Sequence, residues 1–95
     1  MKIRDLKKGQ TVDYVRARVV DMSDVKKVIS KFGKALSLVN VTLEDETGRI
    51  PLTLWERDVN KVKVGDTVEI RDAFVKEFRG EKILTLGRRG TLKVV

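Results

Sequence analysis

Two of the five aromatic residues in this 95-residue chain lie close together among positive charges. Phe74 and Phe78 are four positions apart, with Lys76 midway between them and Arg79 directly after. Exposed rings can stack on the bases of a nucleic acid while neighbouring Lys and Arg side chains follow its phosphates. The same rings could instead belong to a core. The direction in which they point therefore decides what chemistry they can do.

Several kinds of catalytic and metal site are excluded by residue type. The chain has no Cys and no His, so Cys-based zinc sites and the usual nucleophilic triads cannot form. The phosphate-binding pattern GxxxxGK[ST] is also absent. The acidic run 44–46 is followed by Thr47-Gly48, which is typical of a turn between two strands rather than of an acid–base cluster. We expect no enzyme activity, no metal and no cofactor.

The charge balance indicates the kind of partner. Lys and Arg number 21 against 14 Asp and Glu, a net charge of +7, which favours nucleic acid as a polyanionic partner. The alternative is a thermophile-like surface rich in Lys and Glu. No apolar run approaches the roughly 20 residues that span a membrane, and the N-terminus MKIRDLKKG lacks the apolar region of a signal peptide. We expect a cytoplasmic protein with no membrane or small-molecule partner.

Apolar and polar residues alternate along five segments, as expected for half-buried strands. These segments are 12–22, 36–45, 49–55, 67–78 and 82–87, and residues 91–95 are a candidate last edge. The alternation breaks near Val39 and Asn40, which predicts a β-bulge there. Pro51 cannot donate a ladder hydrogen bond, which predicts a bulge or an unpaired stretch at its position.

Two connections remain between the strands. Residues 56–66 have the length of a short helix or loop that crosses from the third strand to the fourth. Residues 23–35 fit either a helix, with apolar residues at helical spacing behind a Ser23 cap, or the two arms of a hairpin that turns at 31–34. Five strands with one crossing segment predict an all-β, closed five-stranded barrel of the oligonucleotide/oligosaccharide-binding (OB) type. A single domain over residues 1–95 is expected.

The alternation also predicts where the rings point. If Ala73 and Val75 face the core after a switch near Asp72, then Phe74 and Phe78 lie outside with Lys76. If Leu54 faces the core, Trp55 lies outside too. Without the switch, Phe74 and Phe78 would be core residues, and Trp55 could instead cover the mouth of the barrel. Arg49 and Arg79 accompany the rings, which is the arrangement of a single-strand nucleic-acid platform.

The segments DETGRIPLTLW, VKVGDTVEIRDAFVKEFRG and LTLGRRG together resemble the OB domains of archaeal replication protein A and simple single-stranded-DNA-binding proteins. The match covers about residues 41–90 well and 3–20 more loosely. The resemblance implies that Trp55, Phe74 and Phe78 stack on bases. It also implies that 23–35 is a projecting hairpin whose tip carries Phe32 as a further ring, beside Lys31 and Lys34. Two positions depart from the family pattern: Thr85 stands where relatives can carry another aromatic residue, and Arg89 where they often have Tyr.

From these residues we expect binding of single-stranded DNA with little sequence preference, in DNA replication, repair or recombination in an archaeal nucleoid. The expected backbone contacts are Arg49, Lys76, Arg79, Lys82, Arg88, Lys31 and Lys34. Other OB domains or subunits of a replication protein A complex are the expected protein partners. Two rival hypotheses are an RNA- or tRNA-binding OB domain and an OB module for protein interaction within a replication assembly.

Overall fold

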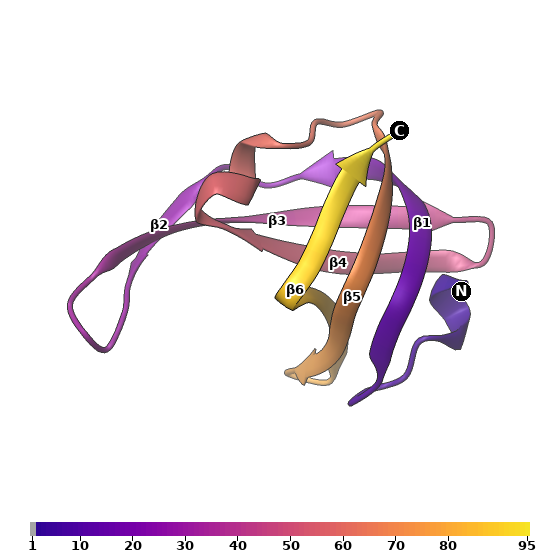
Figure 1. The fold of residues 1–95 in the computed structure, drawn as a ribbon, viewed down its shortest axis with the longest axis horizontal. Coiled ribbons are helices and arrows are strands. Elements are labelled where there is room, and N and C mark those ends of the chain that lie inside the picture. Colours follow the sequence, from indigo (N-terminus) through magenta and orange to yellow (C-terminus); the bar gives the residue numbers. More distant parts are fainter. Residues whose placement is uncertain (1) are drawn as a thin grey trace.

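Five long strands close into a barrel (Figure 1). The computed structural model describes the backbone of residues 2–95, and the side chains of this range other than those at positions 57, 87 and 88. The barrel strands are β1 (Thr11–Met22), β3 (Ala35–Asp45), β4 (Gly48–Trp55), β5 (Thr67–Phe78) and β6 (Glu81–Val94). The sheet order is β1-β5-β6-β4-β3-β2, and pairing of β1 with β3 closes it. The predicted all-β, five-stranded barrel is confirmed.

The segment 23–35 is a hairpin that projects from the barrel (Figure 1), so the helical alternative is wrong. Its first arm, β2 (Lys26–Ile29), pairs only with the start of β3, from Lys26 opposite Leu38 to Ile29 opposite Ala35. Ser23, which the helical reading used as a cap, instead fastens the root of the hairpin to Asn40. Its amide donates to the Asn40 carbonyl at 2.9 Å, and its Oγ accepts from the Asn40 amide at 3.0 Å.

The crossing between β4 and β5 contains only one short 3-10 helix, η2 (Glu56–Asn60). Val59 and Val62 are buried and attach this crossing to the core. A second 3-10 helix, η1 (Ile3–Asp5), precedes β1, and its buried residue Ile3 packs with Leu6. In the part of the chain that the structure describes, no helix is long and apolar enough to cross a membrane.

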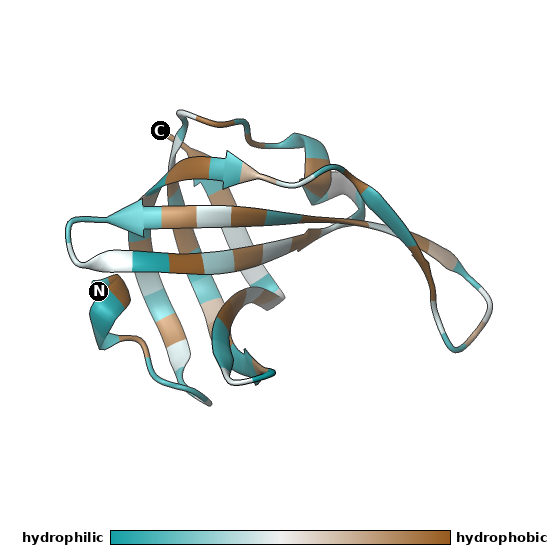
Figure 2. Cartoon of the chain, turned by 180° about the vertical axis from the view of Figure 1, so that it is seen from behind, coloured by the Kyte–Doolittle hydropathy of each residue, from teal (hydrophilic) through white to brown (hydrophobic). Residues whose placement is uncertain are grey.

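The core is made of small and branched apolar side chains at alternate strand positions, seen as alternating bands in Figure 2. Burying one of the Val, Leu or Ile side chains stabilises the fold by roughly 1.5–3 kcal/mol. Alternation predicts that 16 apolar residues face inward, and 13 of them are buried: Val15, Ala17, Val19, Val41, Leu43, Ile50, Leu52, Leu54, Val68, Ile70, Ala73, Val75 and Leu84. The other three, Leu36, Leu38 and Leu86, are only half-buried. None of the three Phe residues or Trp55 belongs to this core.

The predicted bulge near Val39 and Asn40 is wrong. Strand β3 pairs with β4 without a register shift, from Leu38 opposite Trp55 to Asp45 opposite Gly48. Val39 is buried with the alternate residues that follow it, so Leu38 belongs to the other face, where it is half-buried. The register shift lies instead in β1, between Val19 and Asp21.

Pro51 causes no bulge either, but it marks the end of a ladder. The pairing with β3 passes through Pro51 opposite Thr42, whereas β6 pairs with β4 only at Leu52 and Thr53. Because Pro51 has no N–H to donate, it is the residue at which this parallel ladder stops. Residues 91–95 are not a separate edge, because β6 runs on to Val94 as one strand.

Candidate nucleic-acid interface

Three aromatic rings lie outside the barrel on β4 and β5, as the alternation predicts. The exposed fraction is 41% for Trp55, 38% for Phe74 and 60% for Phe78. Their neighbours Ala73 and Val75 are buried, so the alternative that placed the two Phe rings in the core is wrong. Stacking needs rings that a base can reach, and these three rings are partly exposed.

Asp72 is the point at which β5 changes its buried side. The residue has a positive φ of +56°, and the register between β5 and β6 shifts between Arg71 and Ala73. Ile70 is buried before the shift and Ala73 after it. Without this irregularity, strict alternation would turn Phe74 toward the core. The predicted switch near Asp72 is therefore confirmed.

Cross-strand pairing fixes which residues adjoin the rings. Trp55 lies opposite Leu38 on β3, and Phe74 lies opposite Thr85 on β6. Thr53 lies beside Thr85, so the residue that departs from the family pattern falls within this face. The pattern of apolar residues over 36–45 predicts Leu38 to face inward, whereas the structure places it on this outer face. The buried alternation of Val39 and its successors was the signal that could have identified it.

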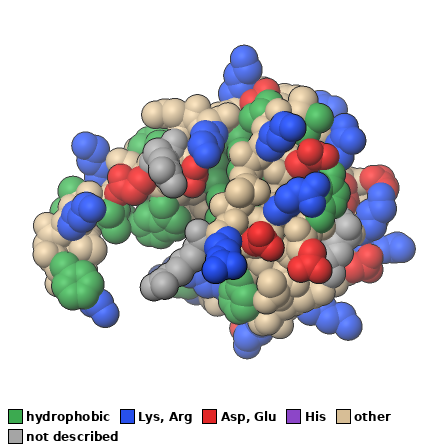
Figure 3. Space-filling view, viewed as in Figure 1, with side chains coloured by type: hydrophobic (Ala, Val, Ile, Leu, Met, Phe, Trp, Pro, Cys, Tyr) green, Lys and Arg blue, Asp and Glu red, His purple; other side chains and the backbone are tan. Residues whose placement is uncertain are grey.

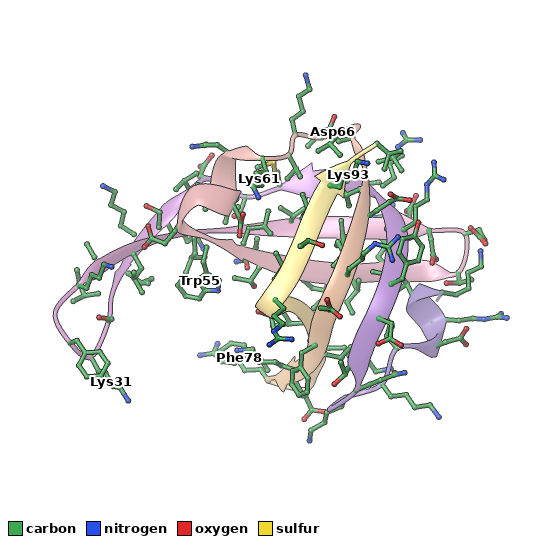
Figure 4. All side chains as sticks on the ribbon, in the orientation of Figure 1. Lys31, Trp55, Lys61, Asp66, Phe78 and Lys93 are labelled. Atoms are coloured by element: carbon green, nitrogen blue, oxygen red, sulfur yellow. The ribbon has the colours of Figure 1, made fainter. Side chains whose placement is uncertain are left out.

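Trp55 and Phe78 line one shallow pocket of about 150 Å³, although they are far apart in the sequence. Lys76 and Ile83 contribute to its wall, together with Thr53, Glu77 and Thr85. In Figure 4, Trp55 lies between Phe78 on the β5–β6 hairpin and Lys31 on the projecting hairpin. The pocket therefore joins two of the predicted stacking residues and one predicted cation.

Phe78 and Arg79 sit at a tight turn. Arg79 and Gly80 have φ of +52° and +82°, and Phe78 pairs with Glu81, which is the pattern of a two-residue type I′ hairpin. The Arg79 guanidinium carbon lies 5.2 Å from the centroid of the Phe78 ring. Lys76 is exposed on the same strand. A ring and two cations are thus presented together at one end of β5.

The N-terminal segment braces the hairpin formed by β5 and β6. The Gly9 amide donates to the Val75 carbonyl at 2.8 Å, and the Lys82 ammonium donates to the Leu6 carbonyl at 2.9 Å. Lys8 pairs with Glu77 at 3.5 Å. These contacts hold the strand that carries Phe74 and Phe78. They also mean that Lys82, a predicted phosphate contact, already has a main-chain partner.

The tip of the projecting hairpin carries an aromatic ring among lysines, and Figure 3 shows hydrophobic and basic side chains along this arm. Phe32 is 86% exposed, and the Lys31 ammonium lies 5.3 Å from its ring centroid. The loop is held by Ser30, whose Oγ accepts from the amides of Phe32 and Lys34. Phe32 therefore does not anchor its own loop, and its ring faces solvent.

Two further predicted phosphate contacts are Arg49 and Arg88. Arg49 pairs with Glu44, with 2.6 Å between Nε and Oε2. It lines a groove of about 490 Å³, shared with Lys82, Arg4 and Pro51, beside the point where the β4–β6 ladder stops. The side chain of Arg88 lies outside the described residues.

Tyr14 lies apart from the three rings, on β1 opposite Arg71 of β5. Its hydroxyl donates to Glu69 at 2.5 Å, and the Arg71 guanidinium lies 4.7 Å from its ring centroid. The hydrogen bond to Glu69, together with burial, raises the pKa of Tyr14. These contacts give Tyr14 a structural role between β1 and β5.

Comparison with known proteins identifies the family to which the chain is similar. A family model described as single-stranded DNA binding protein Ssb-like, OB fold, matches residues 5–94. Single-stranded DNA binding protein Ssb from Saccharolobus solfataricus is 31% identical over 88 residues, which are 93% of this chain and 59% of that protein. Replication factor A from Methanothermobacter thermautotrophicus is 28% identical over 85 residues, 85% of this chain and 11% of that protein. The chain thus spans 59% and 11% of the lengths of these two relatives.

Solved structures agree on the fold. The replication factor A related protein from Methanobacterium thermoautotrophicum superimposes with a TM-score of 0.82 at 27% identity, covering 100% of this chain and 89% of that one. The second OB-fold domain of replication protein A from Methanococcus maripaludis gives 0.82 at 26% identity, covering 100% and 93%. The barrel described above is therefore an OB fold, as the strand pattern predicts.

Proposed function

This chain belongs to the Ssb-like family of OB-fold proteins that bind single-stranded DNA, and we propose that it binds single-stranded DNA by stacking bases on Trp55, Phe74 and Phe78. The observation that carries the proposal is the exposure of these three rings on β4 and β5, in a chain with only five aromatic residues. A fold that used its aromatics for stability alone would bury them, since large rings contribute most when they are removed from water.

Stacking supplies the sequence-tolerant part of the binding energy. Each base on a ring contributes roughly 1–3 kcal/mol, and every base has a face that can stack. Lys76 and Arg79 lie beside the rings and guide the phosphates. Phe32 adds a ring from the hairpin tip, with Lys31 and Lys34 as its cations. The result is binding with little sequence preference.

Arg49, Lys82 and Arg88 are assigned to the phosphate path beyond the rings. Arg49 would exchange Glu44 for a phosphate, and Lys82 would leave the Leu6 carbonyl. Each exchange offsets part of the gain, so we expect smaller contributions from Arg49 and Lys82 than from Lys76 and Arg79. Arg88 is assigned from its basic side chain in the sequence GRRG alone.

The size of the site and its response to salt follow from this arrangement. One barrel of this kind covers on the order of 4–6 nucleotides. If about 3–4 phosphates are neutralised, the logarithm of affinity should fall against the logarithm of salt concentration with a slope of about −2 to −3, at about −0.7 per phosphate. We propose that the protein acts in DNA replication, repair or recombination, beside other OB domains, in the archaeal nucleoid.

A titration of the fluorescence of Trp55, the only tryptophan, with short oligo-dT tests the proposal. It is run at low and moderate salt, with duplex DNA of similar charge as the control. Quenching by the single strand alone, weakening with salt, is expected for a base on the Trp55 ring. No fluorescence change at millimolar oligonucleotide would refute the stacking role of Trp55 and favour the protein-interaction hypothesis.

A further inference from the structure

Three non-glycine residues of the described chain have a left-handed backbone. They are Glu56, Asp72 and Arg79, with φ of +54°, +56° and +52°. Each lies within two residues of one of the three proposed stacking rings. Most residues with a β-carbon are strained in this region, Asp and Asn less than the others, and such a conformation persists where the surrounding structure requires it, commonly at functional sites.

The turn chemistry accounts for only one of the three. Arg79 is the first central residue of a type I′ hairpin, a turn that requires positive φ at both central positions. Glu56 and Asp72 lie in no such turn: Glu56 directly follows β4, and Asp72 lies within β5. Among the side chains that the structure describes, neither of these two has a hydrogen-bond or ion-pair partner. What Glu56 and Asp72 share is their backbone conformation.

Glycine occupies the positive-φ positions elsewhere in the chain. Gly9, Gly33 and Gly65 have φ of +80°, +79° and +100°, and a β-carbon placed on any of them would meet nothing within 4 Å. Glycine adopts this region without strain but also moves over a wider range of φ and ψ. Gly33 directly follows Phe32, the ring on the projecting hairpin.

Both residues lie where the path of the chain changes beside a ring. At Asp72 the buried side of β5 changes, which turns Phe74 outward. At Glu56 the chain leaves the direction of β4 and enters η2, which buries Val59 while Trp55 stays 41% exposed. A β-carbon confines these two turns to a narrow region of φ and ψ.

We propose that Glu56 and Asp72 are positioning residues that hold the rings of Trp55 and Phe74 in the direction that receives bases. This inference rests on the proposed stacking function. A ring that is already fixed loses less conformational freedom on binding, so part of the affinity comes from order present in the free protein. Backbone strain is the energetic cost of fixing the ring in the free protein. Replacing the residue by glycine removes both the strain and the fixed direction of the ring.

Two pairs of variants separate the effect of the backbone conformation from the effect of losing a negative charge. Asp72→Gly is compared with Asp72→Asn, and Glu56→Gly with Glu56→Gln. Both members of a pair lose the same negative charge, but only Asn and Gln keep the β-carbon, and Asn tolerates the left-handed region well. We expect each Gly variant to bind oligo-dT about threefold to tenfold more weakly than its partner. Its thermal unfolding temperature should be equal or higher.

The anisotropy of Trp55 fluorescence in the free protein gives a second, spectroscopic measurement. It should fall in Glu56→Gly and remain unchanged in Glu56→Gln, because only the first frees the backbone beside the ring. Equal oligo-dT affinity within both pairs would overturn the proposal, as would loss of the folded barrel in the Gly variants. Trp55→Ala distinguishes failure of the positioning proposal from failure of the proposed function. If this variant leaves oligo-dT affinity unchanged, the stacking function itself is wrong.

Discussion

The carboxylate of Asp45 holds the N-terminal segment against the turn between β3 and β4. It accepts from the Ile3 amide at 2.8 Å, from the Thr47 amide and hydroxyl at 2.7 and 2.5 Å, and from the Gly48 amide at 3.2 Å. The prediction that the acidic run forms a turn is therefore confirmed. Burial by itself would raise the pKa of Asp45, but the hydrogen bonds from Thr47, Ile3 and Gly48 outweigh it and hold this pKa below its ordinary value.

A lowered pKa makes the contribution of Asp45 dependent on pH. Because the folded pKa lies below the unfolded value of about 4, the stabilisation is present above that pH and is lost as the pH falls through the folded pKa. Asp45→Asn should lower the free energy of unfolding at pH 7 by about 1 kcal/mol, a small value because solvent screens this partly exposed group. Urea denaturation from pH 7 to 3 measures it. A difference that stays constant below pH 4 would contradict the assignment.

The three exposed rings should matter for binding and not for stability. Replacing Trp55, Phe74 or Phe78 by Ala removes one stacking contact, which should weaken oligo-dT binding by about 5- to 150-fold. The free energy of unfolding should change little, because each ring is already partly in water. Val64→Ala is the matched control, since Val64 is an exposed apolar residue on the crossing after η2. Fluorescence anisotropy of a labelled oligonucleotide reports affinity for all four variants.

At the scale of elements, alternation identified the strands wherever one face is buried. It predicted β1, β4 and β5 because their inward residues meet a single core. It failed at Leu38, where an apolar side chain lies outside the barrel opposite Trp55 and belongs to the candidate site. A pattern of residue types cannot distinguish an apolar residue that packs in the core from one that adjoins an exposed ring.

The segment 23–35 shows why the hairpin could not be established from periodicity. Val25, Val28, Ile29 and Phe32 fall at helical spacing, but this spacing indicates a helix only when the residues share a buried face. In the structure none of them is buried, and pairing with β3 determines the conformation of β2. The residue pattern left the helix and the hairpin open, and only the family resemblance favoured the hairpin, because the strand that pairs with β2 follows the segment in the chain.

The projecting hairpin is therefore separable from the fold. Replacing residues 28–36 by Asn-Gly would join the paired residues Lys27 and Ser37 through a type I′ turn. The free energy of unfolding should stay within about 0.5 kcal/mol, since no residue in 28–36 is buried. Loss of Phe32 and its neighbouring lysines should weaken oligo-dT binding by at least about fivefold. Unchanged affinity would show that the hairpin does not touch the strand.

For the whole molecule, the net charge of +7 does not tell where a strand of DNA would lie. Basic residues occur on several sides of the barrel (Figure 3). Arg16 and Arg18 are exposed on β1. Phe74 of β5 pairs with Thr11 of β1. Arg16 lies five residues further along β1, so it is about 17 Å from Thr11. If the rings define the path, only cations beside them should neutralise phosphates.

Two double variants with the same net charge test this. Lys76→Gln with Arg79→Gln removes two cations beside the rings, and Arg16→Gln with Arg18→Gln removes two from the outer side of β1. The first pair should reduce the slope of log affinity against log salt by about 1.4, at about 0.7 per phosphate, and the second should leave it nearly unchanged. If binding depended only on long-range attraction by the total charge, the loss of two cations would weaken it equally in both pairs. Only a reduced slope in the first pair together with an unchanged slope in the second is compatible with a DNA path over Trp55, Phe74 and Phe78.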